Sequence, residues 1–126
     1  SEAKVLADDW DGEGHAPRVK CATTKGDITI QSRPKWAPLG AARFLELVRD
    51  EEFFSANGGV GLFRVVKNFI CQFGVPGDPA VHRRWKSYGQ IKDDPQWMDM
   101  SLKKRMKKGM ISFAGGGSNS RGMELL

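Results

Sequence analysis

Apolar residues occur in short runs along this chain, and two neighbouring runs have the composition of β-strands. Residues 62–66 and 69–73 are dominated by β-branched and aromatic side chains. Lys67 and Asn68 separate the two runs, and this polar connection is short enough for a tight turn. The pattern therefore predicts two strands joined as a β-hairpin.

One polar residue interrupts each of these runs. Arg64 lies between Phe63 and Val65, and Gln72 lies two positions after Ile70. Alternate side chains of a strand share a face, so Gln72 and Ile70 point the same way. By the same rule, Phe63 and Val65 lie on the face opposite Arg64. A guanidinium and an amide among apolar side chains predict a half-apolar recognition surface.

Alternating patterns predict two more strands near the start of the chain, followed by a helix. Residues 19–23 and 28–31 form the strands, and residues 25–27 supply the turn between them. Pro38 suits the first turn of a helix, where a missing N–H costs nothing. The apolar residues that then recur at helical spacing are Ala41, Phe44, Leu45 and Val48. We expect this helix to cap an open end of a barrel.

The beginning of the chain differs from the rest, because it is acidic and contains Gly12, Gly14 and Pro17. We predict a loose acidic leader over residues 1–18, with one short helical turn over residues 3–9. Trp10 is expected to anchor this leader to the body of the protein. No repeat or low-complexity tract follows, so residues 19–126 are predicted to form one domain.

One stretch without a regular pattern, residues 51–61, is predicted to be a loop. Residues 51–61 have turn-forming residues, and we expect Phe53 and Phe54 to point inward from them.

Residues 110–114 are predicted to form a strand, and the three glycines at 115–117 are predicted to form a loop shaped by its backbone.

Residues 75–100 contain several prolines and glycines and predict a long irregular section. Trp85 and Trp97 are expected to be its local anchors. Asp93 and Asp94 lie next to each other before a proline, and we interpret them as a turn or cap rather than as paired catalytic acids.

The composition is that of a globular domain. The chain has 126 residues, of which 40% are hydrophobic, enough for one domain with a core. No apolar run approaches the roughly 20 residues that span a bilayer, and no secretory leader is visible. Because the chain lacks an initiator Met, we expect a targeting segment to have been removed. The expected location is soluble, intracellular or organellar, with the compartment unassigned.

The net charge of +5 is mild, and much of it comes from a basic run over residues 103–108. Such a run can track phosphates. It lacks interleaved aromatic residues, however, and a solvated face is the commoner outcome. We therefore expect no nucleic-acid partner.

The two cysteines, Cys21 and Cys71, have no metal-binding spacing and form no CxxC motif. Both lie inside apolar runs, so we interpret them as small buried thiols rather than as a disulfide.

Three segments of the chain together resemble one known family. The hairpin segment FRVVKNFICQFG, residues 63–74, resembles the active-site signature of the cyclophilins, which are barrel-shaped peptidyl-prolyl isomerases. GMISFAGGGSNSR, residues 109–121, is similar to the family's later strand and glycine-rich loop. TTKGDITI and PKWAPLGAARFLELV are similar to its first hairpin and first helix. The three matches occur in the family's order and cover most of the chain from Lys20 onward.

The resemblance implies a mainly β fold, a cyclophilin-like antiparallel β-barrel with a capping helix. The last strands and the C-terminal helix of the family would lie beyond residue 126. We therefore expect the barrel to be incomplete at its C-terminal end and not to close. A barrel closes only when its first and last strands pair.

The resemblance also implies the site. Arg64 matches the catalytic donor, which hydrogen-bonds the proline nitrogen as the X–Pro amide twists. The residues that match the substrate-binding positions are Phe69, Ile70, Gln72, Ala114, Gly115 and Leu126. Amide resonance sets a barrier near 20 kcal/mol, and lowering it requires no nucleophile. No metal and no other cofactor are therefore expected.

The implied function is peptidyl-prolyl cis-trans isomerisation of X–Pro bonds in peptides or proteins, in the context of protein folding. The alternative is a non-catalytic cyclophilin-like binding or structural subunit of a larger protein assembly. Phe63 stands where the family often has a histidine, Glu124 where it has a glutamine, and Leu126 where it usually has a phenylalanine. These departures keep both functions open.

Overall fold

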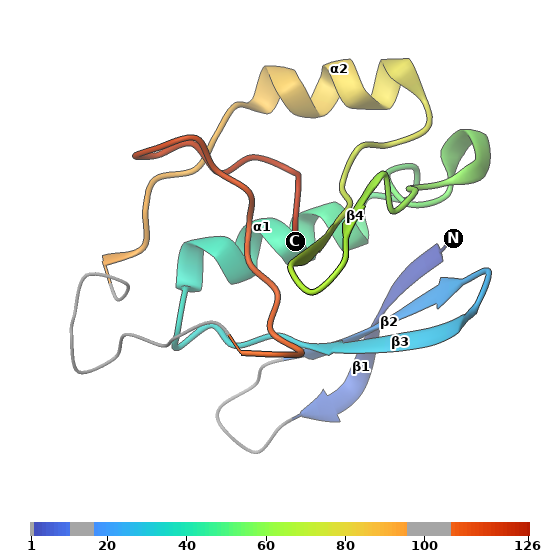
Figure 1. Cartoon of the computed structure of the whole chain (residues 1–126), viewed down its shortest axis with the longest axis horizontal. Helices are drawn as coiled ribbons and strands as arrows, with labels where there is room; N and C mark the ends of the chain where they lie inside the picture. The colour runs from blue at the N-terminus through green and yellow to red at the C-terminus, as the bar shows by residue number, and fades with distance from the viewer. Residues whose placement is uncertain (1, 11–16, 96–106) are drawn as a thin grey trace.

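A three-stranded antiparallel sheet forms one side of the molecule (Figure 1). The computed structural model describes residues 2–10, 17–95 and 107–126. The sheet contains β1 (Glu2–Trp10), β2 (Pro17–Thr23) and β3 (Gly26–Gln31), in the order β1-β2-β3. The strands predicted over residues 19–23 and 28–31 are thereby confirmed.

The short helical turn predicted over residues 3–9 is wrong, because this segment is strand β1. It pairs with β2 over most of its length, with Val5 opposite Val19. Without β1, β2 would have an edge of unpaired N–H and C=O groups, and pairing with that edge outweighs a weak local preference. The side chains of this strand, including Trp10, lie outside the described part of the chain. The leader boundary at residue 18 stays a prediction.

Helix α1 (Pro38–Arg49) begins at a proline as predicted. In Figure 1 it lies between the three-stranded sheet and the second helix. Phe44 and Val48 are buried as the pattern predicted, and Leu47 joins them with no exposed surface. Phe53 and Phe54 follow the helix and point inward, as expected. The buried core consists of Val19, Phe44, Leu47, Val48, Phe53, Phe54, Val81, Trp85 and Leu125.

Residues 75–100 were predicted to be irregular. This prediction is wrong for ten of them, because α2 (Pro79–Tyr88) forms there. Asp78 caps its N-terminus by accepting a hydrogen bond from the Ala80 N–H at 2.8 Å. Pro79 then occupies the first helical position, where it is favoured. Trp85 is buried, as its predicted role of local anchor requires. Trp97 lies outside the described residues.

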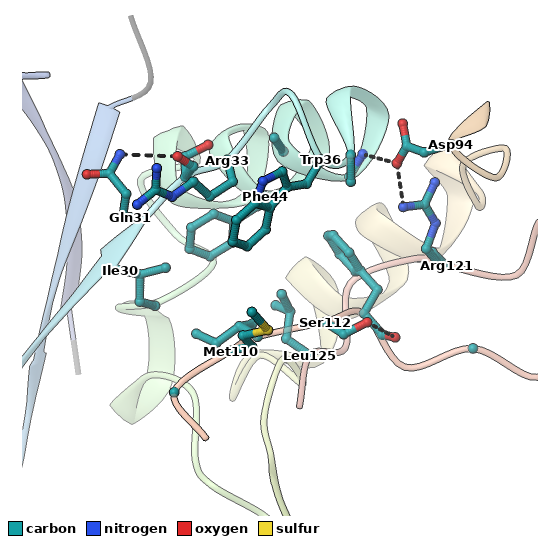
Figure 2. Close-up of a pocket in the computed structure, with 18 of the residues that line it drawn as sticks. Ile30, Gln31, Arg33, Trp36, Phe44, Asp94, Met110, Ser112, Arg121 and Leu125 are labelled. Atoms are coloured by element: carbon teal, nitrogen blue, oxygen red, sulfur yellow. Dashed lines mark hydrogen bonds and ion pairs between the residues drawn. The ribbon is translucent and has the colours of Figure 1, made fainter. Parts of the chain in front are cut away.

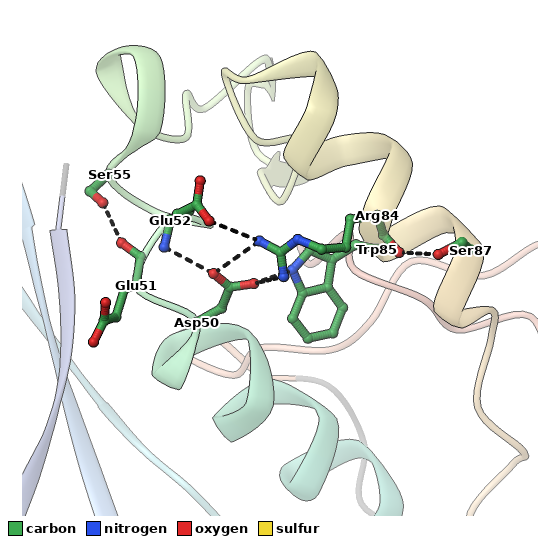
Figure 3. Close-up of polar contacts among 7 residues, drawn as sticks. All are labelled: Asp50, Glu51, Glu52, Ser55, Arg84, Trp85 and Ser87. Carbon is green, nitrogen blue, oxygen red and sulfur yellow. Dashed lines mark hydrogen bonds and ion pairs between the residues drawn. The ribbon is translucent and has the colours of Figure 1, made fainter.

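An ion pair joins the end of α1 to α2 (Figure 3). The carboxylate of Asp50 accepts hydrogen bonds from Arg84 Nη1 at 2.6 Å and from the Trp85 indole N–H at 2.7 Å. The Glu52 N–H donates to the same carboxylate. Burial by itself raises the pKa of Asp50, but hydrogen bonds from Arg84, Glu52 and Trp85 more than offset this and hold it below its ordinary value. Asp50 therefore fixes the two helices to each other.

The second sheet is the predicted hairpin, β4 (Arg64–Val66) and β5 (Ile70–Gln72). Beyond it, Phe73 forms a bridge with Leu125, and Leu125 forms another with Phe113. The strand predicted over residues 110–114 is therefore reduced to an isolated bridge. No closed barrel occurs among the described residues, and its completion by further strands stays a prediction.

The two cysteines differ in environment. Cys21 is half-buried, and burial raises the pKa of its thiol. The prediction that Cys71 is buried is wrong, because its side chain is exposed. Cys71 alternates with Ile70 and Gln72 along β5 and therefore points to the opposite face.

In the described part of the chain, no helix has the length and apolar character needed to cross a membrane.

Candidate functional site

The centre of the candidate site is the antiparallel pair β4–β5. Arg64 lies directly opposite Gln72 in the strand register, and Val66 lies opposite Ile70. Arg64 Nη1 donates a hydrogen bond to Gln72 Oε1 at 3.4 Å. Gln72 is 8% exposed, whereas Arg64 is an exposed residue. The arrangement holds an amide inside the protein and lets it orient a guanidinium that solvent or a ligand can reach.

The hairpin that carries Arg64 also exposes apolar side chains. Phe69 lies in the turn of the hairpin and is 73% exposed. Phe63 and Val65, on either side of Arg64 in sequence, are also exposed. Asn68 has φ 60°, a left-handed conformation that asparagine tolerates, and the Phe69 N–H closes the turn onto Val66 O. The hairpin thus exposes a guanidinium and apolar side chains together, and its role as a recognition surface stays a prediction.

The hairpin continues into a ladder made by the end of the chain. Phe73 and Leu125 exchange backbone hydrogen bonds at 2.8 and 2.9 Å. Ser112 and Leu126 also exchange backbone hydrogen bonds, which join residues 112–114 to residues 124–126. The Ala114 N–H donates to Glu124 O at 2.9 Å. The order across the ladder is thus β4, β5, residues 124–126 and residues 112–114.

This ladder places the residues predicted from the sequence. Arg64, Ile70 and Gln72 occupy the hairpin at one side. Half-buried Leu126 lies in the third segment of the ladder, residues 124–126. Ala114 lies in the fourth segment, residues 112–114, and exposed Gly115 follows it. The ladder therefore brings the predicted residues onto one continuous piece of structure, with Phe69 at the hairpin tip.

Gly74 allows the ladder to form. It has φ 112°, and a Cβ at this position would lie 2.2 Å from Met123 O and 2.7 Å from Glu124 Cα. Both a left-handed backbone and a missing side chain are needed, which only glycine provides.

A cavity of about 770 Å³ lies beside the ladder, between β3, α1 and the segment around residues 109–113 (Figure 2). Its walls are largely apolar and include Ile30, Trp36, Phe44, Met110, Phe113 and Leu125. Arg64 and Gln72 do not line it, so the cavity and the hairpin surface are separate features.

A buried ion pair forms part of the lining of this cavity. Arg121 Nη1 donates to Asp94 Oδ2 at 2.8 Å, and the side chains are only 17% and 1% exposed. The same carboxylate accepts the Leu39 N–H at 2.7 Å and the Gly40 N–H at 3.1 Å. Figure 2 shows Asp94 between the first turn of α1 and Arg121. Asp94 thus caps α1, which confirms its interpretation as a cap.

Comparison with protein families identifies one match. The family model for cyclophilin-type peptidyl-prolyl cis-trans isomerase/CLD matches residues 18–124. The chain belongs to the cyclophilin family. Comparison with curated proteins and with solved structures finds no significant match. The family suggested by three sequence motifs is therefore confirmed, and the match begins at the last residue of the predicted leader.

In this cyclophilin, sequence reasoning missed two charged pairs that connect distant parts of the chain. One is Arg121 with Asp94, and the other is Arg84 with Asp50. A signal for α2 was present, since Asp78 and Pro79 form a typical helix start. Neither ion pair has a local signature, because each joins residues far apart in sequence.

The chemistry available to the cyclophilin site is hydrogen bonding and apolar contact. The described residues contain no group of three or more His, Cys, Asp or Glu side chains arranged to hold a metal ion. The guanidinium of Arg64 can donate hydrogen bonds to a ligand while its Nη1 donates to Gln72 Oε1. Exposed Phe69 and half-buried Ile70 offer apolar contact on the same hairpin.

Proposed function

We propose that this chain is a peptidyl-prolyl cis-trans isomerase acting on X–Pro bonds of peptide or protein substrates. The observation that carries the proposal is the pairing of Arg64 with Gln72 across β4–β5. Membership of the cyclophilin family supports it.

Arg64 is the proposed catalytic residue. In the transition state the X–Pro amide is twisted, and the nitrogen lone pair is no longer delocalised into the carbonyl. A guanidinium that donates to this nitrogen binds the transition state better than either ground state, which lowers the barrier. Arginine suits the role because its charge is permanent and its fork of N–H groups is rigid.

Gln72 is proposed to orient Arg64 and to bind substrate with it. Its buried amide leaves the other guanidinium N–H groups free to meet the substrate. Phe69 and Ile70 are proposed to contact the proline ring, together with Leu126. Ala114 and Gly115 are proposed to bind the backbone of the residues before proline. No metal or cofactor enters this mechanism.

The test is direct. Two-dimensional NMR exchange between the cis and trans signals of an X–Pro peptide is measured with and without the full chain. Acceleration of exchange by wild-type protein and its loss in Arg64→Ala are the expected results. Unchanged exchange with wild-type protein would overturn the proposal.

A second candidate function is a non-catalytic binding subunit of a larger protein assembly. The observation in its favour is the number of exposed apolar side chains on and next to the β4–β5 hairpin, namely Leu62, Phe63, Val65 and Phe69. Such a surface suits a protein partner as well as a peptide substrate. The same NMR experiment separates the two, because a binding subunit shifts peptide signals without accelerating exchange.

A further inference from the structure

The register of the ladder decides which side chains share a face with Arg64. Residues directly opposite each other in antiparallel segments point to the same face. By their bridges, Phe73, Leu125 and Phe113 lie in one row across three segments, and all three belong to the core or pack against it. Because side chains alternate along a strand, the positions next to these three point to the other face of the ladder.

Glu124 is one of these alternate positions. The bridge between Phe73 and Leu125 puts Leu126 opposite Gln72, and Gln72 in turn lies opposite Arg64. Glu124, two residues before Leu126, therefore lies on the face of Arg64 and is a diagonal neighbour of Gln72. Diagonal neighbours are about 7–8 Å apart, within reach of long side chains. In agreement with this register, Leu125 lines the cavity on the inner face and Glu124 does not.

The residues on either side of Glu124 across the ladder are small. Ala114 lies opposite it in the fourth segment, where the Ala114 N–H donates to Glu124 O at 2.9 Å. Gly74 lies on the other side, since a Cβ at Gly74 would be 2.7 Å from Glu124 Cα. A methyl group and a hydrogen atom cover little of the neighbouring side chain. A ligand on this face can therefore reach the carboxylate of Glu124.

The carboxylate of Glu124 can accept a cation from outside the chain. The residue is half-buried, and among the residues that the structure describes none forms a hydrogen bond or ion pair with this carboxylate. A charge partly removed from water is costly unless it is paired. Arg64, the cation on the same face, already donates to Gln72. A cationic side chain of a bound substrate would supply the pairing that the described residues do not.

We propose that Glu124 is a specificity-determining residue, which favours X–Pro substrates with a lysine or arginine close to the proline and disfavours those with an acidic residue there. The inference rests on the proposed isomerase function and adds the substrate class. One face of the ladder then offers a guanidinium to the reacting amide and a carboxylate to a substrate cation. The family pattern has glutamine at this position, so the preference comes from a departure of this chain from that pattern.

The test is a peptide scan by NMR exchange with the full chain at low salt. The parent peptide is acetyl-Ala-Ala-Pro-Ala-Ala-amide, in which lysine, glutamine or glutamate replaces one alanine at a time. Wild type is compared with Glu124→Gln, which removes the charge and keeps the shape of the side chain. The matched control is Glu51→Gln, because Glu51 is exposed just after α1 and its replacement changes the net charge equally.

At one or more of the scanned positions, we expect the wild-type kcat/KM to be about tenfold higher for lysine than for glutamate, with glutamine between them. This is the scale of a solvent-accessible ion pair that is attractive in one peptide and repulsive in the other. Glu124→Gln should reduce the ratio to about twofold or less, and Glu51→Gln should keep the wild-type ratio. Should Glu124→Gln fail to fold, Glu124→Thr removes the same charge with a residue suited to strands and should reduce the ratio equally.

Three results would overturn the specificity role and leave the isomerase proposal intact: a ratio near one at every position, a ratio that Glu124→Gln leaves unchanged, and a ratio that Glu51→Gln lowers equally. A wild-type chain that accelerates none of the peptides would instead overturn the proposed function, and this inference with it.

Discussion

Arg64 and Gln72 face each other across two antiparallel strands, with 3.4 Å between Nη1 and Oε1. One partner is exposed and the other is buried. The pair therefore combines an exposed hydrogen-bond donor with a buried amide that accepts from it.

Replacing Arg64 should remove the proposed donor to the proline nitrogen. Arg64→Ala is expected to lower kcat/KM by about 10²–10³-fold, the usual effect of losing one transition-state donor. Arg64→Lys should recover little, because an ammonium cannot reproduce the rigid fork. Lys67→Ala removes another cation from the same hairpin and should leave kcat/KM unchanged. Near wild-type turnover in Arg64→Ala would exclude the catalytic role.

Acid should weaken the link between α1 and α2. The pKa of Asp50 is lowered in the folded protein, so its contribution to stability is fully present above about pH 4, where an unfolded aspartate is ionised. This contribution is lost as the pH falls through the lowered folded pKa. Asp50→Asn should reduce the free energy of unfolding by about 2 kcal/mol at pH 7. The difference from wild type should shrink towards pH 3, as measured by urea unfolding.

Asp27→Asn serves as the control for this experiment. Asp27 pairs with Lys20 on the exposed surface of β2–β3. Surface pairs contribute about 0–1 kcal/mol, so this variant should stay close to wild type at both pH values. A loss for Asp50→Asn that is the same at pH 3 and pH 7 would contradict the ionic origin of the link.

Gly74 should be one of the least replaceable residues. Gly74→Ala combines a positive φ with a Cβ in contact with the backbone at Met123 and Glu124. We expect a loss of about 3 kcal/mol or more in unfolding free energy. Gly26→Ala shares the positive φ without any close contact and should lose only about 1 kcal/mol. Gly61→Ala has neither feature and should be nearly neutral. Equal effects at Gly74 and Gly26 would show that the ladder does not approach so closely.

The cysteines should differ in reactivity. Cys71 is exposed, whereas Cys21 is half-buried and burial raises its pKa, which lowers its thiolate fraction at neutral pH. Iodoacetamide at pH 7.5 should therefore label Cys71 first, and mass spectrometry of peptides identifies the modified residue. In 6 M guanidinium chloride (an unfolding condition) the difference should disappear. Preferential labelling of Cys21 in the folded protein would reverse the assignment.

The sequence predicted the hairpin of the site well, because its information is local. Arg64 and Gln72 interrupt runs of β-forming residues, and the period of two fixes which side chains share a face. The burial of Cys71 was mispredicted by the same pattern, since an apolar run does not tell which of its two faces is covered.

Segments that depend on distant partners were predicted poorly. β1 is acidic and has weak strand propensity, and it is a strand because β2 is available to pair with it. Arg121 and Asp94 are 27 positions apart, and no local spacing brings them together. α2 was missed for another reason: Pro79 and Gly89 were interpreted as breakers, although they mark the beginning and end of a helix.

The capping of α1 by Asp94 also has a consequence for biosynthesis. The acceptor for the Leu39 N–H lies 55 positions further along the chain. On the ribosome, α1 is therefore translated long before its cap exists, and a helix of 12 residues is marginal without tertiary support. Until Asp94 emerges, the N–H groups of Leu39 and Gly40 lack this acceptor. Completion of this helix is timed by translation of the second half of the chain.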